Sequence, residues 1–116
     1  MHNFRNLKVW ELAFALVKEV YLETKSFPKE EVFSLTTQIR RCAVSIPSNI
    51  AEGCGRGTDK QLSHFLDIAQ GSACELETQL LLAASLNYLS ESKCKILIDK
   101  VQEVQRMIRG FKKTLR

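Results

Sequence analysis

Apolar residues recur at steps of three and four along most of this chain, which is the period of amphipathic helices. The pattern predicts four helices, over residues 7–25, 35–54, 59–86 and 91–114. The helix over 35–54 has a clear apolar side, formed by Leu35, Ile39, Ala43, Ile46 and Ile50. Pro47 cannot donate an N–H to the carbonyl of Ala43, so we expect this helix to bend there. A nearby hydroxyl or amide, such as that of Ser45, Ser48 or Asn49, can satisfy the freed carbonyl.

Two of the helices are apolar over more of their circumference than one core contact requires. The first has an expected core stripe of Trp10, Ala13, Phe14, Val17 and Tyr21. Further apolar residues, among them Val9 and Val20, widen its arc beyond the ~100° that one core face needs. The third helix has apolar residues on its back as well as on its core side. We therefore expect an interface between subunits at Leu12, Leu16, Ile68, Gly71 and Leu82.

The remaining signals favour a bundle. In the fourth helix, apolar residues alternate at steps of three and four from Cys94 to Leu115, which makes a heptad seam. Ser34, Thr58 and Ser90 have the position and chemistry of helix N-caps, and Asn87 can end a helix in the left-handed conformation. Helices of similar length with short connections predict an all-α, up-down-up-down antiparallel four-helix bundle that forms one domain over residues 1–116.

Charge becomes informative once this topology is assumed. Seventeen Lys and Arg against thirteen Asp and Glu give a net charge of only +4. In the predicted bundle, however, the start of the first helix, the second connection and the end of the fourth helix share one end. Only Glu52 and Asp59 are expected among the cations there. The cations, which we expect to form a nucleic-acid interface, are Arg5, Lys8, Arg56, Lys60, Arg109, Lys112, Lys113 and Arg116.

Other chemistry has little support in the sequence. No apolar run is long enough to span a bilayer, so we expect a cytoplasmic protein without a membrane segment. The cysteines Cys42, Cys54, Cys74 and Cys94 form no CxxC pair and are expected to be small buried hydrophobes. A glycine-rich corner over 53–57 could hold a phosphate, but helix capping explains it better. With a lone His64 and no Glu-x-x-His pair, we expect no metal, no cofactor and no enzymatic activity.

Three segments carry a resemblance to one family: LKVWELA in the first helix, LTTQIRRCAVSIPSNIAEG in the second, and GSACELETQLLLA followed by LNYL in the third. They resemble the bacterial four-helix bundle family of the 23S rRNA intervening-sequence proteins. A related branch comprises accessory proteins of diversity-generating retroelements, which partner a reverse transcriptase and bind nucleic acid. The resemblance implies a homopentameric ring and brings no settled biochemical activity. Members often read Ala-Arg-Gly-Ser in the third helix, whereas this chain has Gln70 in place of the arginine.

Two functions are therefore open from the sequence. The first is a non-enzymatic, oligomeric bundle whose basic end binds RNA or DNA, for example fragments of rRNA. The second is a protein-interaction adaptor, such as a partner of a reverse transcriptase, in which the basic end has no direct nucleic-acid role. Salt-dependent binding to nucleic acid distinguishes the two, because neutralised phosphates release counterions.

Overall fold

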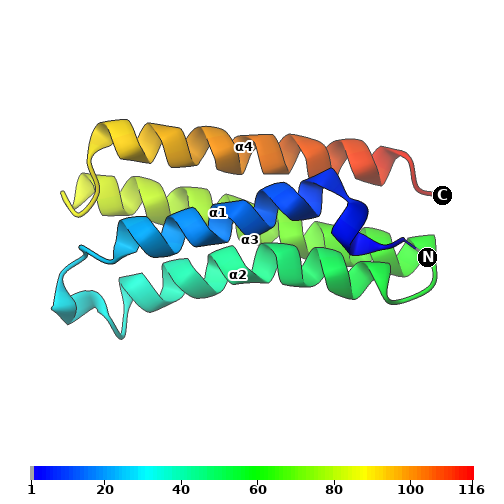
Figure 1. Ribbon diagram of the computed structural model, residues 1–116, viewed down its shortest axis with the longest axis horizontal. Coiled ribbons are helices and arrows are strands. Elements are labelled where there is room, and N and C mark those ends of the chain that lie inside the picture. The colour runs from blue at the N-terminus through cyan, green and yellow to red at the C-terminus, as the bar shows by residue number, and fades with distance from the viewer. Residues whose placement is uncertain (1) are drawn as a thin grey trace.

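Four long helices make up most of the computed structural model, which describes residues 2–116 (Figure 1). They are α1 (Lys8–Thr24), α2 (Leu35–Cys54), α3 (Asp59–Ser85) and α4 (Glu91–Lys113). Short 3-10 turns, Phe4–Asn6 and Lys29–Glu31, precede α1 and α2, and no strand occurs in the described range. The predicted all-α class is confirmed, and each helix begins and ends within one residue of its predicted position.

The helices form a square in which each one contacts its neighbours along the chain. Close backbone contacts join α1 to α2, α2 to α3, α3 to α4, and α4 back to α1, while among residues 2–116 no Cα atoms of diagonally opposite helices lie within 8 Å of each other. The body measures 44 × 24 × 20 Å, so the helices run along its length. Figure 1 shows both termini and the α2–α3 corner at one end, as the up-down-up-down topology requires.

The core faces of α3 and α4 lie where the sequence predicted them. On α3, the buried residues include Leu66, Leu76 and Leu80, and on α4 the seam from Cys94 to Ile108 is buried. No helix among residues 2–116 is long and apolar enough to cross a membrane. The buried faces of the four helices form one apolar core.

The predicted core face of α1 is wrong. Its buried apolar residues are Val9, Ala13, Leu16 and Val20, whereas Phe14 and Tyr21 are 49% and 41% exposed and Trp10 and Val17 are only partly buried. The interior of the bundle contains fully buried alanines, which are Ala13, Ala43, Ala69, Ala73 and Ala83. Helices that meet through alanine pack closely, so the smaller side chains of α1 fit inside and its aromatic rings face outward.

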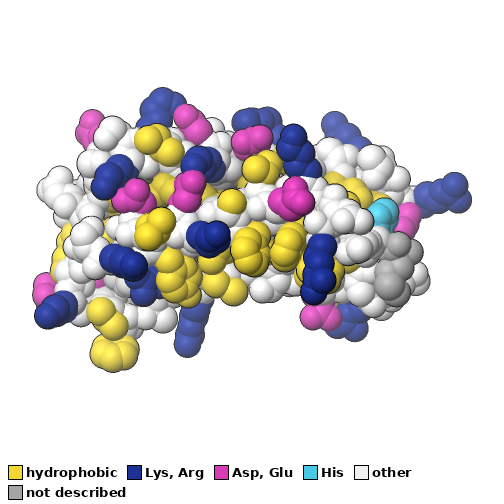
Figure 2. All heavy atoms as spheres, viewed as in Figure 1, with side chains coloured by type: hydrophobic (Ala, Val, Ile, Leu, Met, Phe, Trp, Pro, Cys, Tyr) yellow, Lys and Arg dark blue, Asp and Glu magenta, His cyan; other side chains and the backbone are white. Residues whose placement is uncertain are grey.

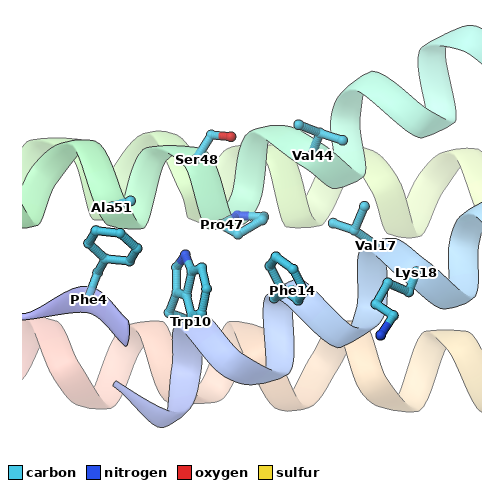
Figure 3. A pocket seen from close by; sticks show the side chains of 9 residues that line it. All are labelled: Phe4, Trp10, Phe14, Val17, Lys18, Val44, Pro47, Ser48 and Ala51. Carbon is cyan, nitrogen blue, oxygen red and sulfur yellow. The ribbon is translucent and has the colours of Figure 1, made fainter. Parts of the chain in front are cut away.

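Helix α2 continues through Pro47, with Ile39, Ile46 and Ile50 completely buried. Figure 3 shows its ribbon changing direction in the turn between Val44 and Pro47, as the missing hydrogen bond predicts. Two of the expected local partners bond elsewhere: Ser45 Oγ donates to the carbonyl of Cys42 at 2.9 Å, and Asn49 Nδ2 donates to that of Ser45 at 2.7 Å.

Thr58, Ser90 and Asn87 are confirmed as capping residues. The hydroxyls of Thr58 and Ser90 accept from the N–H groups of Gln61 and Lys93, each at 3.2 Å. Asn87 adopts φ +65° after α3, which is the left-handed conformation of a helix C-terminus. Ser34 lies at the predicted N-cap position of α2, but its side chain makes no cap bond; its hydroxyl donates to the carboxylate of Glu31.

The end of the bundle opposite the termini is tied together by a polar contact between its two loops. Tyr88, after α3, donates its hydroxyl to Glu31 Oε2 at 2.9 Å, and its ring lies 5.7 Å from that of Phe27. Hydrogen bonds from the hydroxyls of Ser34 and Tyr88 lower the pKa of Glu31 below its ordinary value of 4.5. The charged form of this carboxyl is therefore favoured by folding.

We expect acid to destabilise the bundle partly through Glu31. Because its pKa is lowered in the folded state, the stabilisation is complete above about pH 4.5 and disappears as the pH falls through the lowered value. Replacing Tyr88 by Phe removes one donor, so the free energy of unfolding should decrease less between about pH 6 and about pH 3 than it does in the wild type. Urea unfolding at a fixed protein concentration measures this difference. An identical pH dependence in both proteins would contradict the assignment.

Candidate nucleic-acid interface

Three separate segments bring cations to the end of the bundle that holds the termini, here called the basic end. They are the start of α1, the corner between α2 and α3, and the end of α4 (Figure 1). Figure 2 shows dark-blue Lys and Arg side chains projecting around this end, at the right of the view. The meeting of these segments, which the sequence predicted from topology alone, is thus present in the fold.

The eight predicted cations differ in how they are paired. Arg56 Nη2 lies 3.1 Å from Glu52 Oε2, and Lys112 forms an ion pair with Asp67. Seven of the eight are exposed and Lys112 is half-buried. Within residues 2–116, no carboxylate lies within 4.0 Å of the charged nitrogens of the other six, which are Arg5, Lys8, Lys60, Arg109, Lys113 and Arg116. These six cations are available to an anionic partner.

The acidic residues at the basic end are more numerous than predicted. Besides Glu52 and Asp59, the end includes Asp67, which reaches Lys112 from α3, and Glu11 in the first turn of α1. Asp59 accepts a hydrogen bond from the backbone N–H of Arg116 at 3.2 Å and so holds the end of the chain against α3. These additional carboxylates make the positive potential there weaker than the sequence indicated.

The glycine-rich corner is a helix end and not a phosphate cradle. The N–H of Gly55 donates to the carbonyls of Ala51 and Glu52, and the N–H of Arg56 donates to that of Gly53. Gly57 has φ +90°, which favours glycine in this turn. The hollow beside it is only about 20 Å³, which is too small for a phosphate group. The interpretation as a capping turn is supported by these bonds.

The basic end has little free aromatic surface for stacking bases. Phe4 packs edge-on against Trp10 with ring centroids 5.2 Å apart, and Phe111 is half-buried with His2 at 5.3 Å. The guanidinium of Arg56 lies 5.0 Å from the centre of the Phe65 ring, so that ring is also covered. Contacts to nucleic acid at this end would therefore be made mainly by charge.

The cysteines do not behave alike. Cys42, Cys54 and Cys94 are buried free thiols, as predicted, whereas Cys74 is exposed, which corrects the expectation that all four are buried. Burial, with a smaller effect of Glu75, raises the pKa of Cys42 to about 11. Burial raises the pKa of Cys54 and Cys94 as well, so these three thiols stay protonated at neutral pH.

No group of three or more His, Cys, Asp or Glu side chains that could hold a metal ion occurs among residues 2–116.

The predicted subunit-interface residues lie in different environments. Leu16 is 2% exposed and packs in the core of its own subunit, so the proposal that it contacts another subunit is wrong. Leu12 is half-buried in a hollow between α1 and α4. Ile68, Gly71 and Leu82 are exposed on α3.

The sequence missed the surface that α1 does leave open. Because the buried stripe of α1 lies about a quarter-turn from the predicted one, Trp10, Phe14 and Val17 line an apolar hollow against α2, in which Val44 and Pro47 form the facing wall (Figure 3). The sequence did contain a sign of this open surface, because α1 has two apolar stripes and only one of them can face the core. The two stripes have the same period, however, and periodicity alone does not identify the buried one.

Comparisons with known proteins agree with this fold. The family model described as the 23S rRNA-intervening sequence protein matches residues 5–110. One similar solved structure is a protein of unknown function from the S23 ribosomal protein family of Bacteroides thetaiotaomicron. It has a TM-score of 0.81 and 23% identity, over 90% of this chain and 98% of that chain. A comparison with curated proteins finds no match. Because the family model covers nearly its whole length, the chain belongs to the 23S rRNA-intervening sequence protein family.

Proposed function

We propose that this protein is a non-enzymatic, oligomeric helical bundle that binds the phosphate backbone of RNA or DNA through its basic end. One observation carries the proposal: six exposed cations without carboxylate partners in the described range come together there from three segments of the chain. The same end offers little free aromatic surface, so binding would depend on charge and show little sequence preference. The family name refers to an rRNA insertion, which agrees with a nucleic-acid partner.

Assembly would make this weak surface effective. A single basic end supplies only a few phosphate contacts, and carboxylates lie among its cations. Several copies that present the same end to one nucleic acid would raise the avidity without any new contact. A homo-oligomer, which the family resemblance implies is a pentamer, therefore belongs to the proposal. The apolar surfaces left open on α1 and α3 support it.

The test compares two variants with the same change in net charge. In the first, Lys60, Arg109, Lys113 and Arg116 are replaced by Gln; Lys112 is kept because it pairs with Asp67. In the second, the far-end lysines Lys25, Lys29, Lys93 and Lys95 are replaced by Gln, which also removes the exposed ion pairs of Lys93 with Glu23 and of Lys95 with Asp99. Affinity for RNA and DNA oligonucleotides is measured over a salt series, with oligomer mass and helicity as controls.

We expect the basic-end variant to bind more weakly, with a log–log salt slope that is shallower by about 3 for each subunit in contact, since each lost phosphate contact removes about 0.7–0.9. The far-end variant should bind like the wild type. If the folded basic-end variant binds as tightly as the wild type, the basic end is not the binding surface and the adaptor role is favoured. Equal losses in both variants would show that only net charge matters.

A further inference from the structure

A groove runs along the outer joint between α1 and α2, with a volume of about 380 Å³. One wall is a ladder of rings in which Phe4, Trp10 and Phe14 follow one another with centroids 5.2 and 5.0 Å apart. Figure 3 shows these rings facing Val44 and Pro47 on α2. This surface, called the aromatic groove below, is hollow and lined almost entirely by apolar side chains.

The aromatic groove leaves apolar surface in contact with water. Phe14 is 49% exposed and Tyr21, one turn beyond the groove, is 41% exposed, whereas the fully buried residues of α1 lie on another side of the helix. Figure 2 shows yellow apolar atoms gathered along the middle of the face that α1 and α2 present. A contiguous apolar surface of this kind is typical of a contact site.

A matching ridge lies on the outer face of α3. Ile68, Gly71, Glu75 and Leu82 are all exposed and follow a spacing that places them on one side of the helix. Inside the subunit Gly71 has no neighbour, because a Cβ built there meets no atom within 4 Å. A glycine in the middle of a helix costs about 1 kcal/mol relative to alanine, and close packing in this subunit does not explain it. The dent at Gly71 would let another helix approach this face.

We propose that the aromatic groove receives the α3 ridge of a second copy of this chain. The two shapes are complementary, since a groove cannot fill another groove but a helical ridge can enter it. They also lie on different faces, because α3 runs behind α1 and α2 in the view of Figure 1. Each copy can then offer both surfaces at once, which makes the contact head-to-tail.

Charge supports this pairing. Lys18 borders the groove and Arg41 lies in the hollow that continues it past Val44, and neither has a carboxylate within 4.0 Å among residues 2–116. On the ridge, Glu75 is exposed and likewise has no cation partner in that range. Opposite charges at the rim of an apolar contact fix its register more than they strengthen it. This inference rests on the assembly in the proposed function and names its two surfaces.

The experiment disables one surface at a time. Phe14→Glu places a charge in the groove, and Leu82→Glu places one on the ridge. Each has a matched control on its own helix, Leu22→Glu at 63% exposure and Leu81→Glu at 53%, outside the two surfaces. Mass is measured by light scattering at micromolar concentration, and helicity by circular dichroism. If either glutamate variant unfolds, Phe14→Ser and Leu82→Ser replace them.

We expect the wild type to be larger than a monomer and both controls to match it. Phe14→Glu and Leu82→Glu should each associate at least about 30-fold more weakly, as expected for a residue at the centre of an interface. An equimolar mixture of these two variants should form a complex of two chains and no larger species. The first retains an intact ridge and the second an intact groove, so one contact per pair survives.

Other results would overturn the inference. If both variants keep the wild-type mass while the basic-end variant loses nucleic-acid binding, the proposed function stands and these surfaces are wrong. A mixture that stays monomeric would show that groove and ridge do not bind each other. If Phe14→Glu stays assembled but loses RNA binding, the groove is a nucleic-acid site. A monomeric wild type would remove the assembly from both proposals.

Discussion

Replacing Ile46 by Ala should lower the free energy of unfolding by about 2–5 kcal/mol. Ile46 is completely buried near the middle of α2 and is among the largest fully buried side chains. Its truncation removes apolar area from the core and leaves a cavity that the neighbouring helices fill only in part. Since a domain of this size is stable by about 5–15 kcal/mol, the loss is a large share of the total.

The measurement is urea unfolding at one fixed protein concentration, because assembly makes the apparent stability depend on concentration. Ile96→Ala is the matched control, since Ile96 is 54% exposed on α4 and undergoes the same chemical change. It should alter the free energy of unfolding by less than about 0.5 kcal/mol. Equal effects of the two substitutions would show that Ile46 does not lie in the core.

The sequence was sufficient for the fold because helical period, capping residues and short connections all indicated the same bundle. Thr58 and Asn87 are examples: each has the residue type that its helix terminus requires, and each takes that role in the structure. Ser34 shows where such signals compete. Glu31 lies three residues before it and accepts a hydrogen bond from its hydroxyl, and the Ser34 side chain makes no cap bond to the helix.

The core face of α1 could not be predicted, because both of its apolar stripes satisfy the helical period. What decides between them is how closely α1 packs against its neighbours α2 and α4, which depends on buried residues such as Ala43 of α2 and Val101 of α4. These residues are far from α1 in the sequence. Because the stripe that contains Leu16 is the buried one, Leu16 lies inside and Phe14 lies outside, and the surface of α1 that is open to a partner differs from the predicted one.

The candidate interface was predicted in position but not in strength. Topology alone places the three segments at one end, so the cations could be found from the sequence. The ion pair between Lys112 and Asp67 joins residues 45 positions apart and depends on how α3 and α4 pack. Cys74 is a similar case. Its spacing puts it next to the apolar stripe, but it lies on the exposed flank of α3.

Replacing Gly53 by Ala should destabilise the bundle even though alanine favours helices. Gly53 lies near the end of α2, where a Cβ would be 2.8 Å from Leu62 Cδ1, 2.9 Å from Phe65 Cβ and 3.3 Å from Leu62 Cα. The methyl end of Leu62 can rotate, but Phe65 Cβ and Leu62 Cα move only if α3 shifts away from α2. We expect the crowding to lower the free energy of unfolding by about 1–3 kcal/mol, offset in part by the helix propensity of alanine.

Gly110→Ala separates these two effects. Gly110 lies inside α4, and a Cβ there would have no neighbour within 4 Å. Alanine at this position should therefore raise the free energy of unfolding by up to about 1 kcal/mol through helix propensity alone. Opposite signs for the two substitutions in urea unfolding are the expected result. If Gly53→Ala also stabilises the protein, α2 and α3 are farther apart at Gly53 than the distances above require. The corner between α2 and α3, which brings Arg56 and Lys60 to the basic end, is then more open than described.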